Sequence, residues 1–202
     1  FEKGYHSLSC GCNSYRLIRH EGCLDWCTDW FLRRQKCVVN KKHVSCHVDS
    51  GKRVDAILFR TYAAAKNAGL DVTIVCPACP TYITLPAAHD ATHVTGEKEK
   101  EKAAKHKAAC EAHGMDYLTA CWTTYGGWGK EFVKRFFNPF YKTLKAQEVA
   151  EGGSGFEAIE EKHRDMNRLS ICLARSNAKM VGATAQEMQG QGGGLTSSRQ
   201  RC

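Results

Sequence analysis

Two short apolar runs, each interrupted by one aspartate, constrain the fold of this chain more than any other feature of its sequence. They are KRVDAILF at 52–59 and LDVTIV at 70–75. Both have the branched residues and the alternation of β-strands, in which successive side chains point to opposite faces. A carboxylate inside a buried strand is costly unless another group pairs with it. If the two strands pair, Asp55 and Asp71 can meet, and their charge must then be compensated.

The composition is that of a folded protein with one core. The chain has 202 residues and 43% hydrophobic content, which is enough for one domain with appendages. The net charge of +8 lies in basic clusters and favours an anionic partner, most often nucleic acid, with simple solubility as the alternative. Twelve cysteines are scattered among nine histidines, and neither a secretory signal nor a membrane-spanning segment is evident. We therefore expect a reducing compartment and no membrane partner.

Sequence periodicity predicts a mixed α/β domain. The helical spacing of Leu17, His20, Cys27 and Phe31 predicts one amphipathic helix over 16–35. Strands are expected at 37–46, 53–60, 69–76 and 116–126, and further helices at 97–113, from 126 onward and at 156–180. Gly114 should end the second helix, and Pro139 should kink or break the third. The expected order is helix, three strands, helix, strand, helix, then a C-terminal helix and a flexible tail.

This order, with one acid on the second strand and another on the third, resembles the PD-(D/E)xK nuclease superfamily. Whole segments resemble successive pieces of the restriction-like endonuclease region at the C-terminus of non-long-terminal-repeat retrotransposon reverse transcriptases. These segments are HSLSC, RLIRHEGCLDW, KRVDAILF, LDVTIVCP, KAAKHKAAC and TTYGGWGKEFVKRF. The resemblance runs from about residue 4 to about residue 145, and its ordered set is more specific than any one motif.

The resemblance implies a restriction-endonuclease-like core that nicks target DNA in a metal-dependent reaction. Asp55 and Asp71 would hold Mg²⁺ or Mn²⁺, with the Val72 carbonyl as a third ligand, because these cations prefer carboxylate and carbonyl oxygens. Thr73 occupies the position where the superfamily has its lysine, so the ammonium must come from the following helix. The candidate catalytic lysines there are Lys105, the first choice, and Lys102, the second.

Two departures from the family pattern keep other interpretations open. Val54 stands where the family has a proline, and His106 where it has a tyrosine. An inactive nucleic-acid-binding remnant is therefore the alternative function. At the level of single residues, the alternative is that Asp55 caps a turn and that the lysines solvate an exposed helix.

Zinc is a candidate in three places. His6 and Cys10 match only the second half of the family's zinc knuckle, so Zn²⁺ is expected only in a longer protein that supplies the first half upstream of Phe1. The other two groups are the CPAC stretch at 76–79 with His89 and His93, and the stripe of His106, Cys110 and His113. Buried cysteines and core packing are the preferred explanations of both. A zinc-dependent interaction module is thus the third class of function.

The resemblance also implies a regional organisation and a set of partners. We expect a truncated zinc-knuckle remnant at 1–15, an endonuclease-like domain at 16–145, a hinge and helical extension at 146–181 and a disordered tail at 182–202. The chain would be a fragment of a reverse-transcriptase polyprotein, made in the cytoplasm and acting in the nucleus on DNA, with the element's RNA as a second partner. Phosphate contacts are expected from Lys98, Lys130, Lys134, Arg135 and Lys142, the alternative being an ordinary solvated face.

Overall fold

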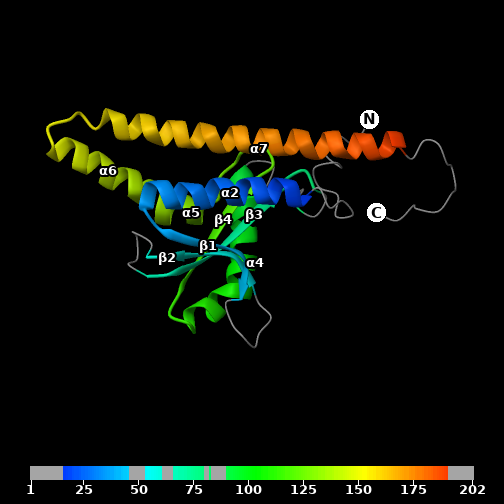
Figure 1. The fold of residues 1–202 in the computed structure, drawn as a ribbon, viewed down its shortest axis with the longest axis horizontal. Coiled ribbons are helices and arrows are strands. Elements are labelled where there is room, and N and C mark those ends of the chain that lie inside the picture. The colour runs from blue at the N-terminus through cyan, green and yellow to red at the C-terminus, as the bar shows by residue number, and fades with distance from the viewer. Residues whose placement is uncertain (1–15, 46–52, 61–65, 80–81, 83–89, 191–202) are drawn as a thin grey trace.

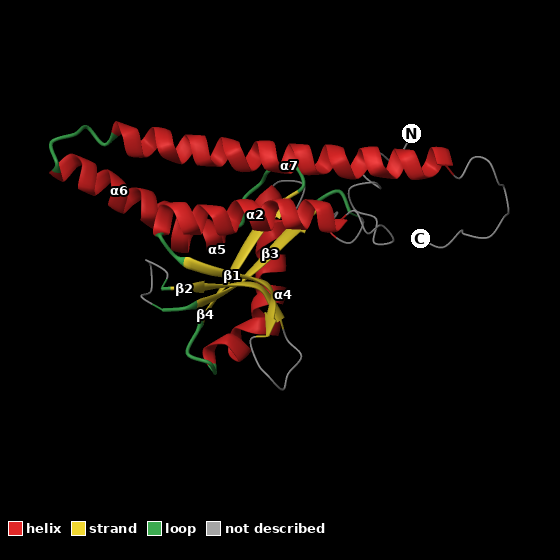
Figure 2. Cartoon of the chain, in the orientation of Figure 1, coloured by secondary structure: helices red, strands yellow, loops and turns green. Residues whose placement is uncertain are grey.

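The computed structural model describes residues 16–45, 53–60, 66–79, 82 and 90–190. Four strands form one mixed sheet, and helices cover it on both sides (Figures 1 and 2). In chain order the elements are α2 (Arg16–Gln35), β1 (Val38–Ser45), β2 (Arg53–Phe59), β3 (Ala68–Val75), α4 (Ala91–Glu111), β4 (Asp116–Thr123), α5 (Lys130–Phe132), the π-helix η2 (Val133–Phe137), α6 (Asn138–Ala150) and α7 (Phe156–Gly190). This is the element order that the sequence predicts. None of the helices in the described ranges has the length and apolar character needed to cross a membrane.

The sheet has the strand order β1-β2-β3-β4. The first two pairs are antiparallel, and β3 and β4 are parallel because α4 connects them. The β2–β3 pairing ends where Ala56 lies opposite Leu70. One residue further along, each strand carries its aspartate. The sequence therefore places both acids at the point where the ladder stops.

The core lies mainly between the sheet and α2. Cys27, Trp30 and Phe31 of α2 pack with sheet residues such as Leu58 and Leu70, and the aromatic residues of α5 to α6 complete this cluster. A smaller cluster on the other face joins the sheet to α4 through contacts that include Cys110 and Tyr117. Side chains alternate between these two faces along β3, where Leu70 and Val72 belong to the larger cluster. Asp71, which alternates with the core residues Leu70 and Val72, therefore faces α4.

Three features of the helices differ from the sequence-based expectation. α4 begins at Ala91, six residues early, because the Asp90 side chain accepts the Thr92 N–H at 2.8 Å and caps the helix. Pro139 does not break its helix, because the π-helix before it has a wider turn, in which Asn138 N–H bonds to the Val133 carbonyl. α7 continues to Gly190, so residues 182–190 of the expected tail are helical.

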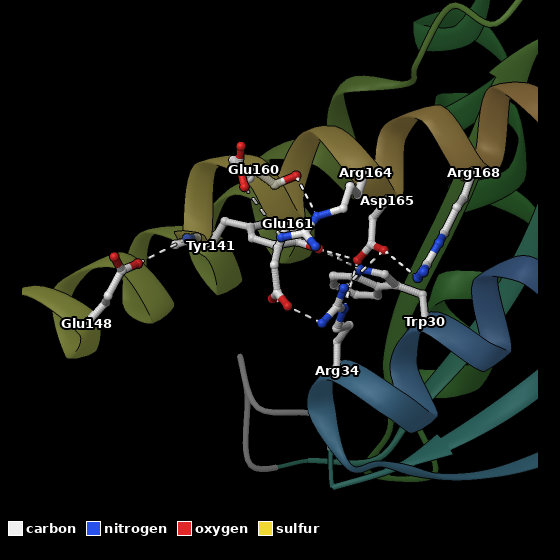
Figure 3. A network of polar contacts seen from close by, with 10 residues as sticks. Trp30, Arg34, Tyr141, Glu148, Glu160, Glu161, Arg164, Asp165 and Arg168 are labelled. Carbon is white, nitrogen blue, oxygen red and sulfur yellow. Dashed lines mark hydrogen bonds and ion pairs between the residues drawn. The ribbon is translucent and has the colours of Figure 1, made fainter. Parts of the chain in front are cut away.

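α7 forms a third layer over α2 and α6 (Figure 1). Figure 3 shows Arg34 of α2 meeting Asp165 and Glu161 of α7. The Arg34 guanidinium donates to the Asp165 carboxylate at 2.8 and 3.2 Å and to Glu161 at 3.0 Å. The Tyr141 hydroxyl of α6 also donates to Asp165. Burial alone would raise the pKa of Asp165, but these hydrogen bonds hold it below its usual value.

Replacing Asp165 tests how strongly this network holds α7. Asp165→Ala leaves Arg34 and Tyr141 without their shared acceptor, so we expect the free energy of unfolding to fall by about 2 to 4 kcal/mol. Glu160→Ala is the matched control, because the ion pair of its side chain with Arg164 on the same helix is long, at 3.8 Å, and exposed. Urea unfolding measures both changes. Equal losses in the two variants would contradict a special role for Asp165.

Glu99 of α4 is a buried acid, 4% exposed, whose side chain reaches the start of α5. Its Oε1 accepts the Glu131 N–H at 3.2 Å, so the carboxyl group caps α5 from a neighbouring helix. Burial outweighs this hydrogen bond and raises the pKa of Glu99 from 4.5 to about 7.

This raised pKa makes the stability depend on pH. Between about pH 4.5 and 7, the folded state keeps the Glu99 proton that the unfolded chain releases. The contribution of this group to the free energy of unfolding is therefore full below about pH 4.5 and is lost as the pH rises to about 7. Glu99→Gln removes the charge and keeps the oxygen acceptor. We expect this variant to exceed the parent in unfolding free energy by about 1 to 3 kcal/mol at pH 8, and the gain to vanish at pH 4. Glu101→Gln, at an exposed position of the same helix, should show no such trend in thermal unfolding.

Candidate active site

A cavity of about 360 Å³ opens where the β2–β3 ladder ends. Its walls come from the first turn of α2, from β2 and β3, and from Lys102 of α4. Both Asp55 and Asp71 line it. The two acids that the sequence singles out are therefore brought together at one cavity.

The backbone N–H and carbonyl of Val72 lie on one side of the cavity, where side chains bind both. Beyond Ala56, β2 no longer supplies ladder partners for β3. The Asp55 carboxylate accepts the Val72 N–H at 2.7 Å instead. His20 Nε2 of α2 lies 3.1 Å from both Asp55 Oδ2 and the Val72 carbonyl oxygen. The N–H and the carbonyl of Val72 thus each have a side-chain partner, as buried backbone groups require.

Asp71 has a different set of partners, on the side of α4. Lys102 Nζ lies 3.1 Å from its Oδ1, and the Tyr117 hydroxyl of β4 donates to Oδ2 at 3.1 Å. His106 Nε2 lies 3.6 Å from Oδ2, and its ring stacks on Tyr117. A cation and a hydroxyl donor therefore compensate the buried charge of Asp71.

The environments of the two aspartates shift their pKa values in opposite directions. Burial would raise the pKa of Asp55, but the hydrogen bonds from His20 and from the Val72 N–H lower it. For Asp71, burial raises the pKa, Lys102 opposes that rise, and the charge of Asp55 adds to it. Burial also acts against a charged His20, yet the hydrogen bond to Asp55 raises its pKa. Such opposed shifts within one cavity are typical of functional sites.

Two arginines on the first turn of α2 complete the wall of the cavity. Arg16 is exposed, whereas Arg19 is 3% exposed and its Nη1 contacts Asn177 Oδ1 of α7 at 3.4 Å. Sequence analysis missed Arg16, Arg19, His20 and Tyr117 as site residues. The spacing i, i+3, i+4 on one helix could have indicated the first three, because it places them on one face.

The other predicted catalytic and phosphate-binding residues are placed unequally. Lys105, the first choice for the catalytic lysine, is exposed, and it is Lys102 that reaches Asp71. Arg135 donates to the Tyr117 carbonyl at 3.1 Å and to Asp116, so it supports β4. Lys98 pairs with Glu101, Lys130 with Asp90, and Lys134 and Lys142 are exposed. The helix of Lys142, α6, lies at the opposite end of the molecule from the start of α2 (Figure 1).

The zinc candidates are only partly within the described ranges. His6, Cys10 and His89 lie outside them. Cys76 is buried, as expected for a cysteine at the end of a strand, and Cys79 follows it in a turn. Of the predicted stripe, His106 and Cys110 are buried in α4, whereas His113 lies in the turn after α4 and is exposed.

The donor atoms around Val72 fit a hard or borderline divalent cation. They are a carboxylate oxygen of Asp55, the Val72 carbonyl oxygen and the imidazole nitrogen of His20, with Asp71 in the same cavity. Among the described residues, no three His, Cys, Asp or Glu side chains form a ready metal-binding group. A cation here would accordingly be held by few side chains, one carbonyl and water, as is usual for Mg²⁺.

Comparisons with protein-family models, with curated proteins and with solved structures gave no match to this chain. The geometry of the cavity is therefore the support for an assignment of function.

The two candidate lysines can be separated without an activity assay. Lys102→Met removes the cation beside buried Asp71, so we expect the pKa of Asp71 to rise further and the unfolding free energy at pH 7 to fall by about 1 to 3 kcal/mol. Lys105→Met on the same helix should change neither quantity. Carboxyl ¹³C NMR titration and urea unfolding measure them. The same response in both variants would contradict the pairing of Lys102 with Asp71.

Proposed function

We propose that the protein is a metal-dependent endonuclease domain that nicks DNA by phosphodiester hydrolysis. The observation that carries this proposal is the meeting of Asp55, Asp71, the Val72 carbonyl and Lys102 at one cavity. Carboxylates, a strand carbonyl and an ammonium are the groups that hydrolysis of a phosphodiester requires. The family resemblance adds the restriction-endonuclease-like fold, which agrees with a mixed sheet whose third and fourth strands are parallel.

Each side chain has a role that follows from its place. Asp55 and Asp71, with the Val72 carbonyl, would hold Mg²⁺ or Mn²⁺. Such a cation would lower the pKa of a water and neutralise charge on the scissile phosphate. In the hydrolysis a water oxygen would attack phosphorus and release its proton to solvent, while the bond to the leaving sugar oxygen breaks and that oxygen takes up a proton from solvent. Lys102, which projects into the cavity, offsets negative charge as the phosphate reacts.

The arginines of α2 give the cavity its preference for an anionic substrate. Arg16 is exposed at the rim, and Arg19 lies in the wall. Guanidinium groups suit phosphate because their fixed fork of donors matches its oxygens. The buried position of Arg19 keeps it desolvated, which strengthens its interaction with a phosphate group. DNA contacts made this way do not depend on base sequence.

In the biological setting that the resemblance implies, the domain belongs to a retroelement reverse-transcriptase polyprotein. It would nick chromosomal DNA in the nucleus, and the freed 3′ end would prime reverse transcription of the element's RNA.

An inactive nucleic-acid-binding remnant is the second candidate function. The observation that favours it is the contact of His20 with both Asp55 and Val72, which gives these groups a partner from the protein itself. Such a remnant would keep the basic residues and bind DNA, with an affinity that falls steeply as salt rises.

Nicking of supercoiled DNA in the presence of Mg²⁺ or Mn²⁺ tests the proposal. We expect Asp71→Asn to reduce the nicking rate at least about a hundredfold, because it removes a ligand charge at almost constant volume. Lys102→Ala should reduce it about ten- to a hundredfold, and Lys105→Ala by less than about twofold. Equal nicking by the parent and Asp71→Asn would refute the assignment. Binding of DNA by a parent that does not nick would establish the remnant instead.

A further inference from the structure

His20 lies at the candidate metal site with one ring nitrogen close to two oxygen atoms. Its Nε2 is 3.1 Å from Asp55 Oδ2 and also 3.1 Å from the Val72 carbonyl oxygen. The nitrogen carries at most one proton, so both oxygens must share it, and a shared hydrogen bond is weak in each branch. A cation placed among the three atoms would satisfy all of them at once.

The separations fit a metal ion with octahedral geometry. Two ligands at right angles, each about 2.1 to 2.2 Å from such an ion, lie about 3.0 to 3.1 Å apart. The contacts of Nε2 with Asp55 and with Val72 both have this length. A hydrogen bond can have it too, so the equality of two contacts from one nitrogen is the informative feature.

The second ring nitrogen of His20 supports the same role. Nδ1 is buried and makes no hydrogen bond within the described part of the chain, while Glu21 Oε1 lies 3.6 Å away. A histidine that binds a metal through one nitrogen commonly donates the other N–H to a carboxylate. The Glu21 side chain is half exposed, and a small rotation of it would bring its carboxylate within hydrogen-bonding distance of Nδ1.

We propose that His20 is a ligand of the cation, together with Asp55 and the Val72 carbonyl, and that the site therefore binds Mn²⁺ in preference to Mg²⁺. This inference rests on the proposed function, because it concerns the same cavity. Imidazole is a poor partner for Mg²⁺ but a good one for transition-metal ions, and a mixed set of carboxylate, carbonyl and imidazole suits Mn²⁺. Asp71, which accepts hydrogen bonds from Lys102 and Tyr117, remains the second carboxylate ligand.

Pulsed electron paramagnetic resonance of the full chain with bound Mn²⁺ tests the inference directly. A coordinated imidazole gives a ¹⁴N modulation of the Mn²⁺ signal, and we expect it in the parent. Labelling histidine with ¹⁵N should replace the ¹⁴N modulation with a ¹⁵N signal. This experiment uses the unmutated chain, so it does not depend on whether a variant folds. His20→Ala should lose the signal and bind Mn²⁺ about ten- to a hundredfold more weakly by calorimetry. The control His113→Ala, at an exposed position in the turn after α4, should keep both.

The outcomes separate this inference from the proposed function. Mn²⁺ bound without nitrogen modulation, or bound equally well by His20→Ala, would overturn the role of His20 and leave the endonuclease proposal standing. Equal affinity of the parent for Mg²⁺ and Mn²⁺ would overturn the predicted preference. Failure of the parent to bind either ion would remove the proposed metal site, and with it both proposals.

Discussion

The candidate site depends on the backbone N–H and carbonyl of one residue, Val72, at the position where β2 stops pairing with β3. Its N–H and carbonyl would be buried without partners if side chains did not reach them. Asp55 takes the N–H and His20 comes close to the carbonyl. The same gap in the ladder opens the cavity. The sheet therefore creates the need for polar side chains and the space in which they can act.

Much of the fold follows from local patterns. The apolar runs around Asp55 and Asp71 predict two strands, and the alternation of side chains correctly predicts that Asp71 lies opposite the face of Leu70 and Val72. The bounds of α2 match the periodic stretch at 16–35. Less visible in the sequence is which side chain of its first turn is buried. Leu17 is 61% exposed and Arg19 is 3% exposed, because Asn177 of α7 lies against that turn.

Only the part of the site that depends on strand pairing could be predicted from the sequence. The register brings the two aspartates to neighbouring positions, and a pairing of strands is enough to expect this. The choice between Lys102 and Lys105 depends on the rotation of α4 against the sheet, which no local pattern specifies. Tyr117 and His20 come from elements far away in the sequence. Their contacts with the aspartates span 46 and 35 positions, so only the tertiary fold reveals them.

The contact of α7 with α2 has a consequence for how the chain is made. Arg34 and Asp165 are 131 positions apart, so the outer side of α2 remains uncovered until most of the domain has left the ribosome. Sheet, α4 and α2 can assemble first, because their contacts close shorter loops. Docking of α7 on α2 then comes last. A nascent chain stalled before residue 165 would expose an incompletely covered helix, which is a surface that chaperones bind.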